Sequence, residues 1–229
     1  RRTFVTALLT PQYNNFVQWQ YRTLKKLNLV RQGTHPVIWC PNDQSPTGDH
    51  DRLEGVGESP IDYIVFKFKL GKQILPAATL RPETIFGVTN MWVNPDEEYV
   101  VAKVGKEEWI VSNSAIEKLE DQLKKVEVKE KIYGKDLIGK KVINPVTKKE
   151  IPILPASFVD PENATGIVMS VPAHAPYDWA GLMDLKSKIK PISVIEVPDF
   201  KEFPAIEMIE KLGIRDQNDK RLDGATKEL

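Results

Sequence analysis

The segment Ile61-Asp62-Tyr63-Ile64-Val65-Phe66-Lys67-Phe68-Lys69-Leu70 decides the fold class. Its apolar side chains fall on alternate positions, at Ile64, Phe66, Phe68 and Leu70. Lys67 and Lys69 occupy the positions between them. A period of two residues is typical of a half-buried β-strand, because successive side chains point to opposite faces of a sheet. The sequence therefore predicts a strand here, with one face against a core.

Other short apolar runs end at turn-forming residues, as strands do. They predict strands over residues 37–40, 74–78, 91–93, 99–104, 151–154 and 166–171. Helical spacing predicts helices over 11–27, 176–189 and 204–212. A fourth helix is expected after Ser114, which with Glu117 forms a capping box, and it would carry Ile116, Leu119 and Leu123. We predict an α+β fold, with a mostly antiparallel β-sheet or β-barrel core decorated by several helices.

The 11–27 helix is expected to begin at Pro11, which suits a first helical turn. Phe16, Trp19 and Leu24 recur at helical spacing, so one face of this helix is expected to pack. A chain of 229 residues corresponds to about one or two domains. We expect a single domain over 1–229, excised from a larger protein, with a core over 61–189 and peripheral segments over 1–60 and 190–229.

Composition excludes several classes of protein. With 41% hydrophobic and 28% charged residues, the chain is not disordered as a whole. No apolar run reaches the length of about 18 residues that a membrane helix needs. Lys+Arg and Asp+Glu are equal at 32 each, so no global positive field attracts nucleic acid. A single cysteine, Cys40, excludes an internal disulfide and a cysteine-rich zinc site.

Residues 118–149 hold ten lysines and five acidic residues. Two interpretations of this local excess remain open. The first is a solvated, lysine-rich loop, and the second is a local contact surface for nucleic acid.

The first candidate site is Thr79-Leu80-Arg81-Pro82-Glu83-Thr84, which follows an expected strand. Pro82 disfavours helix at the preceding residue and suits a first helical turn, so the segment predicts a sharp junction. Backbone N–H groups at such a junction could hold an anion or an oxyanion. In the alternative interpretation, the two threonines only satisfy backbone groups and Arg81 pairs with an acid.

The second candidate site lies in residues 164–179, which predict a turn, a buried strand, a loop and the start of a helix. Asp178 falls in the first helical turn, where it could cap free amides or reach a cation such as a substrate ammonium group. His174 falls in the loop, and a hydrogen-bonded loop histidine is its simplest interpretation. With His35 and His50 it is too dispersed to predict a metal site.

No nucleophile elbow, P-loop or dinucleotide fingerprint occurs, so covalent catalysis and ATP use have no support. The two candidate segments together offer hydroxyls, amides, one arginine and one carboxylate. Such a set suits the orientation of water against an already activated ester.

The runs from Ala78 to Asn90 and from Ala164 to Trp179 resemble the editing domain, called connective polypeptide 1, of leucyl-tRNA synthetases. The first run looks like the threonine-rich motif of that family. Leu80 and the pair Thr89-Asn90 are similar to the archaeal and eukaryotic branch, and residues 171–176 favour the archaeal form. The resemblance covers essentially the whole chain.

This resemblance implies a β-barrel core inserted in a larger synthetase, and hydrolysis of mischarged tRNA(Leu) carrying isoleucine, norvaline or methionine, with rejection of leucyl-tRNA(Leu). Asp178 would hold the substrate's α-ammonium group, and Thr84 would exclude leucine by its bulk. The implied catalytic residues are Asp178, Thr79 and Arg81. The implied substrate-binding residues are Thr84, Leu80, Val168, Met169, Ser170 and His174. The bacterial branch has Thr-Thr and His-Asp where this chain has Thr79-Leu80 and His174-Ala175, so a second hydroxyl and a second carboxylate are missing.

No metal or cofactor is implied for this domain, since ATP and Mg would serve the absent catalytic domain of the parent enzyme. The implied partners are the 3′ acceptor end of tRNA(Leu) and the rest of a cytoplasmic synthetase chain, with no membrane and with a monomeric isolated domain. Two rivals remain: the related editing domain of valyl-tRNA synthetase, and a catalytically silent module that docks a tRNA acceptor end.

Overall fold

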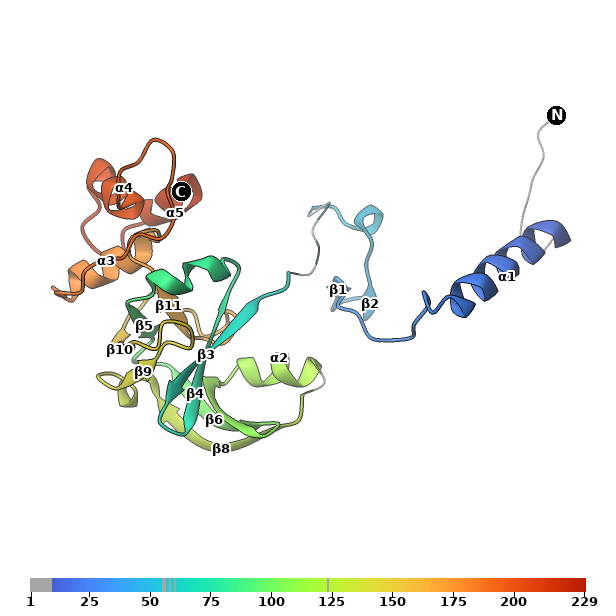
Figure 1. Ribbon diagram of the computed structural model, residues 1–229, viewed down its shortest axis with the longest axis horizontal. Coiled ribbons are helices and arrows are strands. Elements are labelled where there is room, and N and C mark those ends of the chain that lie inside the picture. The colour runs from blue at the N-terminus through green and yellow to red at the C-terminus, as the bar shows by residue number, and fades with distance from the viewer. Residues whose placement is uncertain (1–9, 55–56, 58, 60, 123) are drawn as a thin grey trace. The chain divides into compact units, whose positions relative to one another are not determined.

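The computed structural model describes residues 10–54, 57, 59, 61–122 and 124–229. The chain divides into two compact units, residues 1–61 and residues 62–229. Each unit is described by itself (Figure 1).

The first unit consists of one helix and a small two-stranded sheet. Its elements are α1 (Pro11–Lys26), β1 (Trp39–Cys40), β2 (Ser45–Pro46) and the 3₁₀ turn η1 (Asp49–Asp51). The predicted helix is confirmed, but the expectation that one face packs is wrong, because α1 has no buried residue in the described part of the chain. Phe16 and Trp19 are 57% and 60% exposed. Local propensity and Pro11 suffice to form the helix, whereas burial needs a partner surface that this unit does not supply.

The second unit is built on a nine-stranded sheet with the strand order β11-β5-β10-β9-β3-β4-β7-β6-β8. The strands are β3 (Ile64–Leu70), β4 (Gln73–Thr79), β5 (Asn90–Val93), β6 (Glu98–Val104), β7 (Glu107–Ser112), β8 (Val126–Tyr133), β9 (Lys141–Ile143), β10 (Glu150–Pro155) and β11 (Val168–Ser170). Six of the eight pairings in this sheet, as far as the described residues show, are antiparallel. The predicted α+β class with a mostly antiparallel sheet is therefore confirmed.

The sheet does not close into a barrel, which corrects the finer form of that prediction. Across the described strands, β8 pairs only with β6 and β11 pairs only with β5, so both remain edges. The sheet instead curls around one apolar core, to which Phe68, Val101, Ile153 and Met169 contribute. Because that core is filled from every part of the sheet, burial does not require the two edges to meet.

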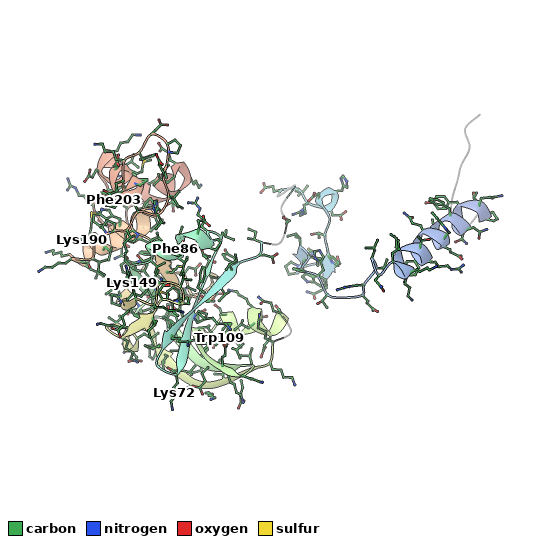
Figure 2. The ribbon with its side chains drawn as sticks, in the orientation of Figure 1. Lys72, Phe86, Trp109, Lys149, Lys190 and Phe203 are labelled. Carbon is green, nitrogen blue, oxygen red and sulfur yellow. The ribbon has the colours of Figure 1, made fainter. Side chains whose placement is uncertain are left out.

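The helices of the second unit are α2 (Ala115–Asp121), α3 (Pro176–Asp184), α4 (Pro204–Leu212) and α5 (Arg221–Glu228), with the 3₁₀ turns η2 (Pro82–Gly87) and η3 (Gly134–Asp136). Helices α3, α4 and α5 gather at one end of the unit around a separate apolar cluster that contains Met208 and Leu222 (Figure 1). Helix α2 covers the sheet elsewhere and shares a second cluster with Trp109, which is labelled in Figure 2.

Several predicted bounds change. Helix α3 ends at Asp184 rather than at 189, and Lys186 adopts a left-handed φ of 48° just beyond it. Ser114 precedes α2 but makes no side-chain cap, because its hydroxyl donates to the Pro161 carbonyl instead. Leu123, expected on that helix, lies outside the described residues.

The interpretation of 118–149 as a loop is wrong. Strands β8 and β9 lie within it, and β8 pairs with β6 along its whole length. Lys131 of β8 forms an ion pair with Glu98 on the adjacent strand β6, and Lys129 forms one with Glu108 on β7, one strand further away. Part of the lysine excess is therefore neutralised within the sheet.

Candidate functional site

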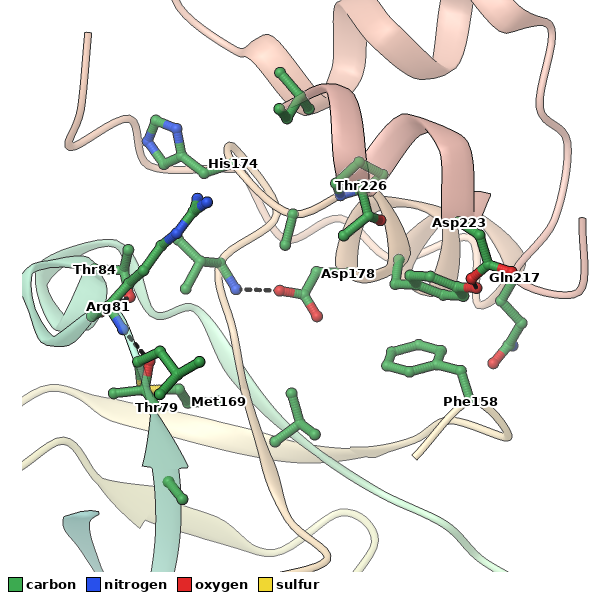
Figure 3. Close-up of a pocket in the computed structure, with 18 of the residues that line it drawn as sticks. Thr79, Arg81, Thr84, Phe158, Met169, His174, Asp178, Gln217, Asp223 and Thr226 are labelled. Carbon is green, nitrogen blue, oxygen red and sulfur yellow. Dashed lines mark hydrogen bonds between the residues drawn. The ribbon is translucent and has the colours of Figure 1, made fainter. Parts of the chain in front are cut away.

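A cavity of about 780 Å³ opens between the sheet and helices α3 and α5, within the second unit (Figure 3). Its wall combines three segments that are distant in sequence: the end of β4 with η2, strand β11 with the loop that follows it into α3, and the C-terminal residues 217–229. The two candidate segments of the sequence thus lie together. Predicted site residues on its wall are Thr79, Leu80, Arg81, Thr84, Val168, Met169, His174 and Asp178.

The β4–η2 junction is a tight turn closed by its own hydroxyls. The Arg81 backbone N–H donates to Thr79 Oγ1 at 3.0 Å, and Thr84 Oγ1 donates to the Arg81 carbonyl at 2.7 Å. Both threonines therefore satisfy backbone groups, as the alternative interpretation proposed. Arg81 itself forms no ion pair with any residue that the structure describes, and Figure 3 shows its side chain extending toward His174. Its guanidinium group remains available to an anionic ligand.

Asp178 lies in the first turn of α3 and is only 4% exposed. Its Oδ1 accepts a hydrogen bond from the Trp92 indole at 2.9 Å, and its Oδ2 accepts one from the Val171 backbone N–H at 2.6 Å. Burial raises the pKa of Asp178 to about 7, and the hydrogen bonds from Val171 and Trp92 oppose this rise. No cation pairs with Asp178 among the described residues. The cavity thus contains a buried carboxyl group that ionises much less readily than an exposed aspartate.

His174 is oriented by the backbone of a following segment. Its Nε2 accepts hydrogen bonds from the N–H groups of Val194 and Ile195, at 3.0 and 3.4 Å. Burial lowers the pKa of His174, and the positive charge of Arg81 lowers it further. An accepting Nε2 and a lowered pKa both favour the neutral ring, so the interpretation as a hydrogen-bonded loop histidine is confirmed.

Strand β11 brings only part of the predicted binding set to the cavity. Val168 and Met169 lie on its wall. Ser170 does not: it is fully buried, faces Asn90 across the β11–β5 ladder, and its carbonyl accepts the Thr89 N–H at 3.1 Å. Ser170 is the last residue of the short strand β11, and it is buried beside strand β5 rather than at the cavity wall.

The C-terminal wall of the cavity was missed by sequence reasoning. Helix α5 and the turn before it supply Gln217, Asn218, Lys220, Asp223, Thr226 and Leu229. Tyr177 Oη donates to Asp223 Oδ1 at 2.7 Å, which joins α3 to α5, and burial and this contact raise the pKa of Tyr177 to about 12. The polar run over 215–229 has no motif, so only the packing of α5 on α3 could identify these residues.

No group of three or more histidine, cysteine, aspartate or glutamate side chains in the described ranges is arranged to hold a metal ion. No described helix is long and apolar enough to cross a membrane. The wall of the cavity offers a buried carboxyl group, two threonines, one unpaired guanidinium and apolar side chains. This set can bind a ligand that carries both a cation and an anion beside a small apolar group.

Comparison with known protein families gives one match, over residues 56–224, to the family model described as "Leucyl-tRNA synthetase, editing domain". The chain is 51% identical over 244 residues to the leucine–tRNA ligase of Methanothermobacter thermautotrophicus, covering 100% of this chain and 26% of that protein. It is 47% identical over 253 residues to the leucine–tRNA ligase of Pyrococcus abyssi, again covering 100% of this chain and 26% of the other. The chain spans about a quarter of the length of these relatives.

Solved structures give the same likeness. A crystal structure of GlLeuRS-CP1 superposes with a TM-score of 0.63 and 26% identity, over 72% of this chain and 82% of that one. The P. knowlesi cytosolic leucyl-tRNA synthetase editing domain superposes with a TM-score of 0.67 and 19% identity, over 72% of this chain and 81% of that one. The second likeness concerns the fold alone.

Proposed function

The chain belongs to the family of leucyl-tRNA synthetase editing domains, and from this premise we propose that it hydrolyses the ester bond of mischarged aminoacyl-tRNA(Leu). The predicted family, and its archaeal type, are confirmed by relatives at about half identity over the whole chain. The rival assignment to valyl-tRNA synthetase is dropped. The proposed substrates are the isoleucyl, norvalyl and methionyl esters, with rejection of leucyl-tRNA(Leu).

One observation carries the proposal: the buried carboxyl group of Asp178 has two N–H donors and no cation among the described residues. A carboxylate in such a site is stabilised most by a cation that arrives with the ligand. The α-ammonium group of an aminoacyl ester is such a cation. Its positive charge lowers the pKa of Asp178, so binding of the ester and ionisation of Asp178 favour each other.

The two threonines then differ in what they can offer. Thr84 donates its one hydroxyl proton to the Arg81 carbonyl, so it contributes bulk to the cavity rather than a hydrogen-bond donor. Thr79 accepts from the Arg81 N–H and keeps its own proton for the ester or for a water molecule beside it. This difference supports Thr84 as the residue that excludes leucine and Thr79 as one that orients the reacting groups.

Hydrolysis of an aminoacyl ester needs positioning more than a strong base, because the ester is already activated. Arg81 would bind the phosphate-bearing 3′ end, while Leu80, Val168 and Met169 enclose apolar parts of the ligand. His174, neutral and fixed through Nε2, would line the same part of the cavity. We place no metal or cofactor in this reaction, and the source of the nucleophile is water.

The partners we propose are the acceptor end of tRNA(Leu) and the remainder of a longer synthetase chain, of which the relatives' matching segments are a part. We propose a cytoplasmic setting, and an editing domain whose predicted site residues lie in 61–189 and whose cavity is completed by residues 217–229. The silent-docking alternative relies on the lysines of 118–149, and the ion pairs of Lys129 and Lys131 reduce the positive charge available there.

The test is hydrolysis of preformed isoleucyl-tRNA(Leu) and leucyl-tRNA(Leu) by this chain, with Asp178→Ala as the control. We expect loss of the isoleucyl ester only, slowed at least about a hundredfold by the substitution, because a buried charge-assisted contact is removed. Hydrolysis that is unaffected by Asp178→Ala contradicts the proposal. If the chain hydrolyses neither ester, the wild-type and Asp178→Ala forms of the full-length synthetase are compared in the same assay. If the full-length wild type also fails to hydrolyse isoleucyl-tRNA(Leu), the proposed function is rejected.

A further inference from the structure

We propose that Trp92 is a positioning residue of the editing site, whose indole N–H holds the Asp178 carboxyl group in the orientation that receives the substrate's ammonium group. The inference deepens the proposed function and rests on it. Trp92 does not line the cavity, so it would act only through Asp178.

The two residues are 86 positions apart in sequence and meet at the junction of β5 and α3. The Trp92 side chain is fully buried, and its Nε1 lies 2.9 Å from Asp178 Oδ1. Val171, from the segment after β11, donates to Oδ2. Each carboxylate oxygen therefore has one donor, and the two donors come from different elements. Two such points fix the rotation of the carboxyl group as well as its position.

The indole ring is itself fixed by close packing. Phe158 meets it edge-on, with 5.7 Å between ring centroids and 72° between planes. Gly181 of α3 lies against both rings, because an added Cβ would come within 3.2 Å of Trp92 Cζ2 and Cη2 and of Phe158 Cε1. Gly181 follows Asp178 by one helical turn, so the missing side chain lets the ring lie against the helix at the level of the carboxyl group.

A phenylalanine could fill much of this space, so packing alone does not explain the indole. The distinctive contribution of tryptophan is one N–H donor in a place that water does not reach. That donor stabilises the ionised carboxylate without bringing a competing positive charge. The result is an oriented acceptor whose remaining lone pairs can receive a ligand cation.

Trp92→Phe tests the inference, because it removes the N–H and keeps an aromatic ring. The matched control is Trp109→Phe: Trp109 is also buried, and its Nε1 donates to Glu107 Oε2 at the same 2.9 Å. Trp109 belongs to the apolar cluster beneath α2 and is not on the cavity wall. Both substitutions thus remove one indole-to-carboxylate hydrogen bond, but only one of them involves Asp178.

The readout is the pH profile of kcat/KM for isoleucyl-tRNA(Leu), which reports ionisation in the free enzyme. Loss of a donor to the charged form raises the pKa of Asp178, so the acidic limb should move up by on the order of one pH unit in Trp92→Phe. The rate near pH 6 should fall about tenfold and recover as the pH rises. Trp109→Phe should keep the wild-type profile. The other titratable groups on the cavity wall are Tyr63, His174, Tyr177, Asp219, Lys220 and Asp223, with Arg81 permanently charged, and both variants retain them all.

A profile in Trp92→Phe that falls uniformly at every pH, without a shifted limb, overturns the inference and assigns Trp92 a structural role only. If Trp92→Phe does not fold, the wild-type protein provides the test through the Trp92 indole N–H resonance. That resonance should titrate with a midpoint near the pKa of Asp178, about 7, and should be flat in Asp178→Asn. A flat resonance in the wild type overturns the inference. Because this measurement needs no substrate, it separates the contact between Trp92 and Asp178 from any failure of the proposed hydrolysis.

Discussion

The buried carboxyl group of Asp178 should make the protein less stable as the pH rises, and Asp178→Asn should remove that dependence. The folded-state pKa of Asp178 is about 7, whereas its ordinary value is 3.8. Between these values the folded protein holds a proton that the unfolded chain has lost. The unfolded state therefore binds fewer protons, and the free energy of unfolding falls with increasing pH across a window from about pH 4 to about pH 7.

The size of the effect follows from the same two values. Integration of the linkage relation from about pH 5 to about pH 8 gives a loss of roughly 2–3 kcal/mol in the wild type. The asparagine in Asp178→Asn cannot ionise, so this variant should lack the pH-dependent loss of unfolding free energy. Its amide has a single acceptor oxygen, so either Trp92 or Val171 loses its partner, at a cost of about 1–3 kcal/mol that does not change with pH. The variant should be the less stable protein at pH 5 and should approach or exceed the wild type at pH 8.

The assay is urea unfolding of both proteins at several pH values, with the difference in unfolding free energy plotted against pH. In thermal unfolding, the difference between the Tm values of the two proteins should change by about 5–10 °C over the same pH range. Since His174 and the surface carboxylates are present in both proteins, their contributions largely cancel in the difference. Parallel stability curves from about pH 5 to about pH 8 would refute the claim that burial raises the pKa of Asp178.

Three further predictions concern specificity, packing and charge. Thr84→Ala should begin to hydrolyse leucyl-tRNA(Leu), because it frees the volume that leucine needs; protection of leucine in a folded, active variant removes Thr84 from that role. Gly166→Ala should lower the urea-derived unfolding free energy by about 2 kcal/mol or more, because its φ is +69° and a Cβ would lie 2.4 Å from the Ser112 Cβ. The double variant Lys129→Ala and Lys131→Ala should leave the unfolding free energy nearly unchanged, since both ion pairs are exposed to solvent. Its affinity for tRNA(Leu), measured by filter retention, should also stay within about twofold of the wild-type value. A much larger loss of affinity would favour the silent-docking alternative.

Strands with a clear alternation of apolar residues could be predicted from the sequence, and strand β8 shows where that signal fails. Its apolar residues Val126, Val128 and Ile132 are separated by charged ones, and none of the three is fully buried, so the lysine-rich context hides the strand. The ladder between β6 and β8 contains a bulge between Val101 and Ala102, which also interrupts the regular pattern of pairing. A strand at the sheet edge has only one partner and a largely exposed face, so its sequence is constrained weakly.

The two halves of the candidate site could be predicted because each is a local event. Thr79 to Thr84 is a turn closed within six residues, and Asp178 occupies a first helical turn. The groups that control Asp178 could not be predicted, since Trp92 reaches it across 86 positions and Asp223 contacts the adjacent Tyr177 across 46. Nothing in the local pattern around Trp92 distinguishes a core tryptophan from one whose indole holds a functional carboxyl group.

The chemical identity of the donors around Asp178 bears on why the site can bind a cation at all. If Arg81 formed an ion pair with Asp178, the carboxylate would be fully ionised but already occupied. If the carboxyl group were buried without donors, its pKa would rise further and it would be neutral at pH 7, with little attraction for an ammonium group. An indole N–H and a backbone N–H avoid both outcomes, because they stabilise the ionised form while carrying no net charge. A raised pKa that two neutral donors hold in check is therefore what the proposed role of Asp178 requires, since the carboxyl group is deeply buried and its negative charge is left for the proposed ligand.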